Sequence, residues 1–151
     1  MEKQQLIDAL KTRFPGAEFP EGTQFPEMII SPDQLHETAQ ALRSEELFCF
    51  DYLVSLTAVD FIKQMTIVYH LESIGHRRLI VLKTSVSDRE NPAVDTVSDI
   101  WTGAGFHERE VFDLFGIRFT NHPDLRRLFM DDDYGYPLRK DFRDEINIIE
   151  R

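Results

Sequence analysis

Three runs of strand-like residues in the middle of the chain constrain its fold more than any other sequence feature. They cover residues 50–61, 65–71 and 79–86, and Val, Ile, Thr, Tyr and Phe are frequent in them. Residues of these types favour the pleated, half-buried surface of a sheet. The last two runs are joined by the polar segment 72–78, whose Gly75 suits a hairpin turn. We therefore expect a β-hairpin in this part of the chain.

Two helical patterns precede the strands. Residues 2–14 place apolar side chains at helical spacing, and Pro15-Gly16 ends the pattern. A second helix is predicted to begin at Ser31, which can cap it, and to run to about Ser44. Pro32 suits the first position of this helix, because its missing N–H would find no partner there in any case.

A short strand is expected at Gln24–Ile30, between the two helices. Pro26 lies inside it and cannot donate a hydrogen bond to a neighbouring strand, which indicates a position at the edge of a sheet. Strand-rich segments that follow helices are typical of an α+β fold. We therefore predict a two-layer domain in which a mixed β-sheet is covered by helices.

The last third of the chain changes character. Val94–Trp101 is predicted to be a short helix, and Ala104–Phe115 a longer one that stops at Gly116, where glycine can adopt the left-handed conformation. From residue 120 onward there is little periodicity. The sequence is therefore divided into an α+β domain, residues 1–119, and an extended C-terminal interface segment, residues 120–151.

Composition argues against several classes of protein. The formal net charge is −10, whereas a protein that binds duplex nucleic acid needs a basic surface. Cys49 is the single cysteine, so the chain by itself forms neither an internal disulfide nor an all-cysteine iron–sulfur cluster. No run approaches the ~20 apolar residues of a membrane span, and the first residues lack a signal-peptide pattern. A cytoplasmic location is therefore expected.

Glu108 is the unusual residue of the last predicted helix, because it falls at the centre of an apolar arc. A carboxylate in such a place has to be neutralised, paired or hydrogen-bonded, since burying it alone is costly. A guanidinium group is the expected partner. The alternative is an exposed position in the first helical turn, which favours acidic residues. The candidate arginines are Arg126, Arg127 and Arg139.

The C-terminal segment combines arginine with Leu, Phe and Tyr. It is too apolar for a disordered linker. Arginine and tyrosine are enriched at protein interfaces, so an extended strap of this composition suits docking on another protein. A strap that wraps around its own domain explains the same composition, and both interpretations stay open at this point.

Three blocks of sequence resemble the signature of one family. They are Glu-Arg-Glu-Val-Phe-Asp-Leu-Phe-Gly-Ile at 108–117, His-Pro-Asp-Leu-Arg-Arg-Leu at 122–128 and Pro-Leu-Arg-Lys-Asp-Phe at 137–142. Trp101 resembles the family's tryptophan before the first block, and 50–53 and 57–60 resemble its weaker N-terminal pattern. By these residues the chain resembles the C-type subunit, also known as the 30 kDa-type subunit, of respiratory NADH:quinone oxidoreductase (complex I).

The resemblance implies a non-catalytic scaffold and assembly subunit in the peripheral arm of a proton-translocating enzyme. The whole complex passes electrons from NADH to quinone, but this chain is expected to have no active site and no cofactor. NADH, flavin, iron–sulfur clusters and quinone would be handled by partner subunits. The resemblance also implies docking on the large quinone-site subunit, and a peripheral position on the cytoplasmic side of the bacterial inner membrane.

Charged residues of the last helix and the C-terminal segment are predicted to form a structural charge network at or near the subunit interface. Within it, Arg109 and Asp113 are four residues apart and are expected to lie together on the helix. The predicted network comprises Glu108, Arg109, Glu110, Asp113, His122, Asp124, Arg126, Arg127, Arg139, Lys140 and Asp141.

Three other functions compete with the scaffold. A hydrolase needs two acids in different environments, and Glu108 and Glu110 point about 200° apart on a helix. A Mg²⁺ or Ca²⁺ site at Asp131–Asp133 would need a loop that makes consecutive acids converge. The equivalent subunit of a membrane-bound hydrogenase or a ferredoxin-dependent complex is the closest alternative, because the module that accepts electrons lies outside this chain.

Overall fold

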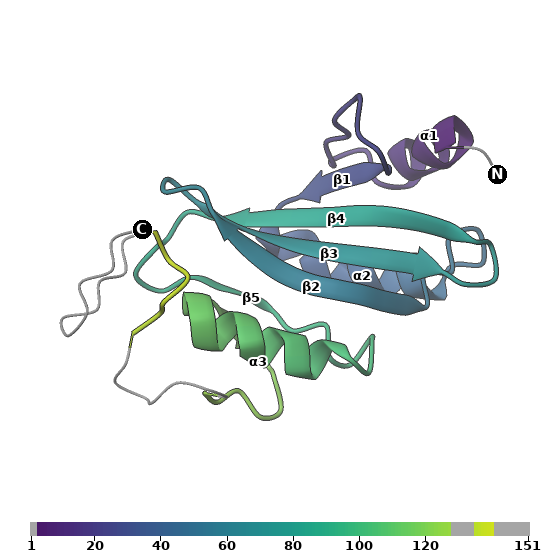
Figure 1. Cartoon of the computed structure of the whole chain (residues 1–151). Coiled ribbons are helices and arrows are strands. Elements are labelled where there is room, and N and C mark those ends of the chain that lie inside the picture. The colour runs from purple at the N-terminus through teal and green to yellow at the C-terminus, as the bar shows by residue number, and fades with distance from the viewer. Residues whose placement is uncertain (1–2, 128–134, 141–151) are drawn as a thin grey trace.

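The structure, a computed structural model, describes residues 3–127 and 135–140 (Figure 1). It confirms the predicted α+β fold with a mixed sheet. In chain order, the elements are α1 (Lys3–Arg13), β1 (Glu27–Ile30), a 3₁₀ turn (Pro32–Gln34), α2 (Leu35–Ser44), β2 (Tyr52–Asp60), β3 (Met65–Ser73), β4 (Arg78–Val86), β5 (Ala93–Asp95), α3 (Ala104–Phe115) and β6 (Arg118–Thr120).

The main sheet has the strand order β1-β4-β3-β2. β2, β3 and β4 form two successive antiparallel hairpins, whereas β1 pairs with β4 in parallel. β1 is an edge strand, as Pro26 predicted: the proline lies just before it, and its carbonyl oxygen accepts a 2.9 Å hydrogen bond from Val81 N–H. In the turn between β3 and β4, Arg77 rather than Gly75 has the left-handed backbone, with φ of +55°.

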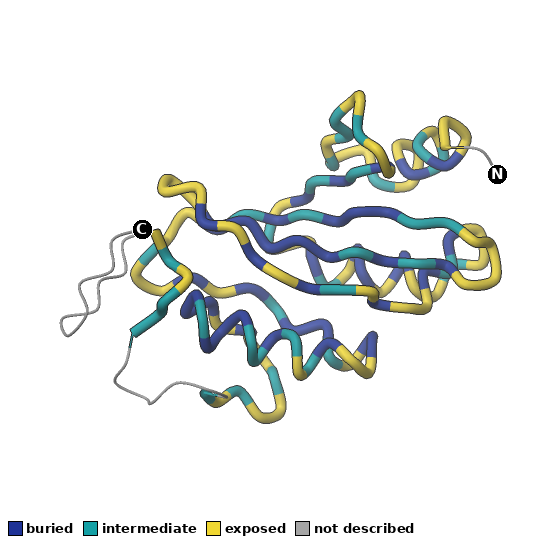
Figure 2. Tube along the Cα trace, viewed as in Figure 1, coloured by how far each residue is buried: buried dark blue, intermediate teal, exposed yellow. Residues whose placement is uncertain are grey.

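The core lies between one face of the sheet and the helices. Along β2, Leu56, Ala58 and Asp60 point inward and alternate with more exposed residues. In Figure 1, α2 lies behind the sheet and α3 lies below β2, beside β5. Figure 2 shows the resulting pattern, with buried stretches along the strands and the inner sides of the helices. The largest fully buried side chains include Tyr69, Phe48, Phe50, Phe119, Leu10 and Met28.

The predicted helix at Val94–Trp101 is wrong. Its first residues belong to β5, which pairs in parallel with β6 in a separate two-stranded sheet and places Val94 opposite Phe119. Both side chains are buried, and Thr96 N–H extends the pairing to the carbonyl oxygen of Thr120 at 2.9 Å. Burial against a strand far along the chain outweighs the local helical preference of this segment.

The start of α2 also differs from its prediction. Ser31 lies at the expected position with an extended backbone, but its side chain makes no capping hydrogen bond. Pro32 opens a 3₁₀ turn, in which Gln34 N–H donates to the carbonyl oxygen of Ser31 at 3.1 Å, and the α-helix begins at Leu35. The 3₁₀ turn therefore satisfies the N–H group of Gln34 with a backbone carbonyl, and the Ser31 hydroxyl is not needed as a cap.

Candidate functional site

The described part of the C-terminal segment packs on its own domain. The division at residue 120 stays a prediction, and its boundary falls inside β6. Beyond β6, the structure describes residues 121–127 and 135–140. Leu138 N–H donates to the carbonyl oxygen of Leu114, at 3.0 Å, which joins the segment to α3.

α3 buries two of the predicted network residues completely, Glu108 and Asp113. They are five residues apart, so their side chains leave the helix about 140° apart. Each carboxylate therefore meets its own set of partners, and the predicted residues divide into separate groups.

Glu108 is held by the segment that follows β5. Its Oε1 accepts a 2.5 Å hydrogen bond from the Thr96 hydroxyl, and its Oε2 accepts a 2.9 Å hydrogen bond from Val97 N–H. The predicted pairing with an arginine is therefore wrong, and so is the exposed alternative. A hydroxyl and a backbone N–H satisfy the two oxygens, which is the requirement that burial imposes.

Burial raises the pKa of Glu108 to about 7. The hydrogen bonds from Thr96 and Val97 lower it, and the charge of Asp99 raises it further. Desolvation dominates because the carboxylate is removed from water without a directly bonded cation. At neutral pH the protonated and ionised forms of Glu108 are therefore both populated.

His122 lies beside Glu108, with its Nε2 at 3.8 Å from Oε1 and its side chain almost fully buried. Its Nδ1 accepts a 2.9 Å hydrogen bond from Asp124 N–H, which leaves the proton of the neutral ring on Nε2. Nε2–H then donates to the carbonyl oxygen of Gly105 at 2.9 Å. The imidazole thus ties the chain after β6 to the first turn of α3.

Asp113 forms the second group with Arg127. The Arg127 Nε lies 2.6 Å from Oδ1 of Asp113, and their side chains are only 7% and 0% exposed. The same guanidinium donates to the carbonyl oxygens of Asp113, at 3.0 Å, and Gly135, at 2.6 Å. Arg127 therefore connects α3 to both described stretches of the C-terminal segment.

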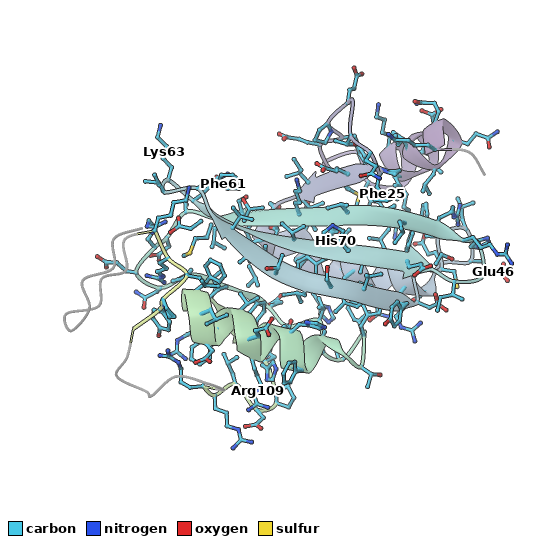
Figure 3. All side chains as sticks on the ribbon, in the orientation of Figure 1. Phe25, Glu46, Phe61, Lys63, His70 and Arg109 are labelled. Atoms are coloured by element: carbon cyan, nitrogen blue, oxygen red, sulfur yellow. The ribbon has the colours of Figure 1, made fainter. Side chains whose placement is uncertain are left out.

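Arg109 does not form the expected pair with Asp113, whose carboxylate is bonded to Arg127. Among the described residues, Arg109 makes no ion pair, and its Nε is buried without a hydrogen-bond acceptor. Figure 3 shows its side chain on the outer side of α3, away from the main sheet.

Tyr136 fills the space between two arginines at the end of α3. Its ring centroid lies 4.9 Å from the guanidinium carbon of Arg127 and 5.0 Å from that of Arg139. Arg139 also donates to the carbonyl oxygen of Phe115 at 2.5 Å. Gly116 ends α3 with φ of +78°, as predicted, and a Cβ there would lie 2.7 Å from the tyrosine ring. Glycine is required for both the conformation and the close approach.

Asp60 is a member of the site that sequence reasoning missed. Its carboxylate is 1% exposed and accepts hydrogen bonds from Arg89, at 2.6 and 2.8 Å, from Ile62 N–H at 2.8 Å and from Lys140 N–H at 2.9 Å. The bonds to Arg89 hold its pKa well below the usual range. One signal was present in the sequence: Asp60 continues the inward alternation of Leu56 along β2.

The remaining predicted residues are less constrained. Arg126 and Asp124 form a 3.3 Å ion pair, with side chains 68% and 58% exposed. Glu110 makes no ion pair with another described residue and is partly exposed. Lys140 contributes its backbone N–H to Asp60, and Asp141 lies outside the described residues. A role of this network at a subunit interface stays a prediction.

Exposed apolar side chains lie near Asp60. Phe61 and Ile62, in the turn between β2 and β3, are 56% and 64% exposed, and Leu138 is 38% exposed. Ile62 has φ of +74°, which is unusual for a β-branched residue. Because Asp60 binds the N–H groups of Ile62 and Lys140, these side chains lie at the same end of the sheet. We call Phe61, Ile62 and Leu138 the apolar tip.

Two further properties concern only residues 3–127 and 135–140. No group of three or more His, Cys, Asp or Glu side chains in these stretches is placed to hold a metal ion. Asp131–Asp133, the acidic run considered above, lies outside them. No helix within the same stretches has the length and apolar character needed to cross a membrane.

Comparison with known proteins points to one family. Residues 28–146 match the family described as "Respiratory-chain NADH dehydrogenase, 30 Kd subunit". The C-type subunit of the NADH-quinone oxidoreductase of Moorella thermoacetica is 39% identical over 141 residues, which cover 91% of this chain and 93% of that protein. The combined C/D-type subunit of the same enzyme in Phocaeicola vulgatus is 48% identical over 120 residues, or 78% of this chain. The match spans only 23% of that longer protein.

A solved structure resembles the chain over nearly its whole length. It is a chain of the membrane-bound sulfane sulfur reductase, an archaeal respiratory membrane complex. The TM-score is 0.81 with 25% sequence identity, and the match covers 95% of this chain and 86% of that chain.

Proposed function

The chain belongs to the family of the 30 kDa subunit of respiratory-chain NADH dehydrogenase, and on that premise we propose that it is a non-catalytic scaffold subunit in the peripheral arm of an NADH-quinone oxidoreductase. Its role is assembly and rigidity, while partner subunits bind NADH, flavin, iron–sulfur clusters and quinone. The absence of a catalytic role is supported by its buried polar groups, whose hydrogen bonds hold the fold together. Both oxygens of Glu108 and Nε2 of His122 are engaged in hydrogen bonds that join segments of the fold, and Nδ1 of His122 accepts one within its own loop.

The observation that carries the docking role is the apolar tip. Phe61, Ile62 and Leu138 are exposed, yet the backbone around them is fixed by the buried carboxylate of Asp60. Exposed apolar side chains on a rigid backbone favour binding, because little conformational entropy is lost when a partner covers them. The left-handed backbone of Ile62 adds strain, a feature that concentrates at functional sites.

The large quinone-site subunit is the partner that we propose for the apolar tip. Several relatives carry a name of the combined C/D type, so sequences of two subunits are joined in one protein. Such a fusion favours a lasting contact between the C-type part and the D-type part. Through this partner, the chain would lie at the periphery of the membrane, on its cytoplasmic side.

The experiment that tests this function is affinity purification of the tagged chain from gently solubilised membranes, with mass spectrometry of the proteins that accompany it. Co-purification of a D-type subunit, the cluster subunits and a flavin-binding NADH module is expected. Recovery of the chain alone would contradict the scaffold role.

The contribution of the apolar tip is tested by the double variant Phe61→Ser, Ile62→Asn. Asparagine tolerates the left-handed backbone, so the change removes apolar surface with little added strain. Recovery of the D-type subunit should fall at least tenfold. The control is Leu47→Ser, an exposed apolar residue (48%) in the connection between α2 and β2, which should leave recovery unchanged. Equal losses in both variants would contradict docking through the tip.

A second candidate function is the equivalent subunit of a related respiratory complex. The TM-score of 0.81 to a chain of the sulfane sulfur reductase favours it, because this fold also occurs in a membrane complex of another kind. The same mass spectra decide between the two. Hydrogenase-type or ferredoxin-dependent partners in place of the NADH module would keep the scaffold role in a different enzyme.

A further inference from the structure

A groove of about 670 Å³ lies at the end of the sheet opposite the apolar tip. Three segments that are distant in sequence form it: the beginning of α1, residues 24–26, and the turn between β3 and β4 with its flanking residues. Its apolar lining comes from Leu6, Phe25, Pro26, Ile74 and Leu79. We call it the N-terminal groove.

The groove exposes apolar surface that the fold does not cover. Phe25 is 36% exposed and Ile74 is 58% exposed, and both line it. A single exposed apolar residue needs no explanation, but apolar side chains converging from separate segments are typical of a binding site. A groove of this size accommodates one bulky apolar side chain and its neighbours.

The rim of the groove is basic, although the whole chain has a net charge of −10. Lys3, Arg77 and Arg78 line it, against one carboxylate, Glu72. The ammonium of Lys3 donates to the carbonyl oxygen of Thr23, a neutral acceptor that leaves its charge in place. Neither Lys3 nor Arg77 pairs with a carboxylate among the described residues. The groove therefore attracts an acidic partner, whereas the chain as a whole repels one.

The turn that forms one wall is held rigidly. Ile74 N–H donates to Oδ1 of Asp51 at 3.2 Å, and the His76 ring bonds the carbonyl oxygen of Glu46 at 3.0 Å. Arg77, in the same turn, has a left-handed backbone with φ of +55°. As at the apolar tip, a partner that binds to this turn would cause little loss of backbone conformational entropy.

We infer that the N-terminal groove is a second docking site, occupied by an acidic segment of a neighbouring protein subunit that inserts one bulky apolar side chain. The inference rests on the proposed scaffold function, because it requires a multisubunit complex. β3 runs from the tip to the groove with nine residues, or roughly 30 Å. Figure 3 shows this separation, with Phe61 near one end of the sheet and Phe25 towards the other. A chain with a docking site at each end bridges two partners.

The test is photo-crosslinking within the assembled complex. A photoreactive phenylalanine analogue replaces Ile74 in one tagged chain and Phe61 in another, and mass spectrometry identifies the cross-linked peptides. From position 74 we expect a peptide of another subunit that contains Asp or Glu close to the linked residue. Position 61 should reach a different segment. Capture from position 74 of lipid, of this chain alone or of nothing would overturn the inference.

The proposed function and this inference can fail separately. If partners co-purify and position 61 cross-links while position 74 does not, the scaffold function stands and the groove is not a docking site. If no partner co-purifies, the scaffold function itself fails.

Charge reversal tests the acidic nature of the occupant. Aspartate tolerates the left-handed backbone at this position. Arg77→Asp should therefore lower the cross-link yield from position 74 at least fivefold without adding backbone strain. The control is Lys11→Glu, an exposed lysine of α1 outside the groove, which should leave the yield unchanged. Equal yields from the Arg77→Asp complex and the unaltered complex would contradict electrostatic recognition.

Discussion

Asp60 and Glu108 are both buried carboxylates, yet the fold shifts their pKa values in opposite directions. Asp60 accepts two hydrogen bonds from the guanidinium of Arg89, and its pKa is lowered. Glu108 accepts hydrogen bonds from a hydroxyl and one backbone N–H, and its pKa rises to about 7. Burial by itself raises the pKa of a carboxyl group, and here a bonded cation reverses that effect.

The two carboxylates also stabilise different parts of the molecule. Asp60 joins the end of β2 to the C-terminal segment through Lys140 N–H, and so fixes the apolar tip in its ionised form. Glu108 joins α3 to the segment after β5. Because its pKa is about 7, its carboxyl group is only partly ionised at neutral pH. The backbone at the apolar tip is therefore fixed by a charge that persists at physiological pH.

Removal of the Asp60 carboxylate should have the largest effect. Asp60→Ala leaves the Arg89 guanidinium and two backbone N–H groups without their acceptor, which lowers the free energy of unfolding by roughly 3–5 kcal/mol. The midpoint of urea denaturation measures the loss. Asp99→Ala is the control, because its 2.9 Å pair with His36 is exposed and should contribute below about 1 kcal/mol. Similar midpoints for Asp60→Ala and Asp99→Ala would contradict the larger contribution of the buried carboxylate.

Low pH tests whether the Asp60 carboxylate stabilises the fold in its ionised form. Because the folded pKa of Asp60 is depressed, its contribution is complete above the unfolded value of 3.8 and is lost as pH falls through the lower folded value. The stability difference between the parent chain and Asp60→Ala should therefore shrink below about pH 3.8. A difference that stays constant to pH 2 would contradict ionic pairing.

Arg127→Met extends the comparison to a third buried carboxylate. The variant removes the buried 2.6 Å ion pair between Arg127 and Asp113, and the free energy of unfolding should fall by roughly 3 kcal/mol. The neighbouring variant Arg126→Met is a matched control, since that side chain is 68% exposed, and it should cost below about 1 kcal/mol. Chemical denaturation of both variants measures the contrast, and a larger loss at Arg126 would refute it.

Glu108→Gln should change the pH dependence of stability. The carboxyl ionises near 4.5 when unfolded and near 7 when folded, so its contribution is complete below pH 4.5 and is lost as pH rises to 7. Between pH 5.5 and 8.5 the loss amounts to roughly 2 kcal/mol. The amide cannot ionise, so the variant should gain that amount on the parent chain over this range. Parallel pH profiles of urea denaturation would contradict the raised pKa.

Thr96→Val is the finest test, because its effect on the pH dependence of stability should be the smallest of the series. The hydroxyl lowers the pKa of Glu108, so its removal moves that pKa further above 7. It also removes the hydrogen bonds of this hydroxyl with Glu108, with the Ser98 hydroxyl and with Ser98 N–H, at a net cost of about 1 kcal/mol each. The pH at which stability stops falling reports the folded pKa, and a shift to lower pH would contradict the role of Thr96.

Much of the fold could be predicted because local pattern and tertiary environment agree. Runs rich in β-branched and aromatic residues located β2 to β4, Pro26 placed β1 at an edge, and Gly116 marked the end of α3. β5 escaped prediction, because a three-residue strand carries no period of its own and exists through its pairing with β6. The capping role of Ser31 failed for a similar reason, since a 3₁₀ turn paired the backbone instead.

The candidate site was predictable in its residue types more than in its pairings. Periodicity identified Glu108 as a carboxylate facing apolar side chains, and its burial was one of two predicted outcomes. Its partner could not be deduced, because no local pattern distinguishes Thr96 from other threonines. Only the pairing of β5 with β6 places Thr96 beside α3. The link between Asp60 and Lys140 spans eighty residues, and no local pattern connects them.

The sequence by itself determined the α+β class, the edge position of β1 and the resemblance to the 30 kDa subunit family, and it identified Glu108 as the carboxylate that burial would constrain. These follow from backbone preferences, side-chain periodicity and motifs, which are properties of short stretches. Tertiary structure decided which groups meet: Arg89 with Asp60, Arg127 with Asp113, and Thr96 with Glu108. The physical reason is that the sign of each pKa shift depends on the nearest partner in space, and folding alone chooses that partner.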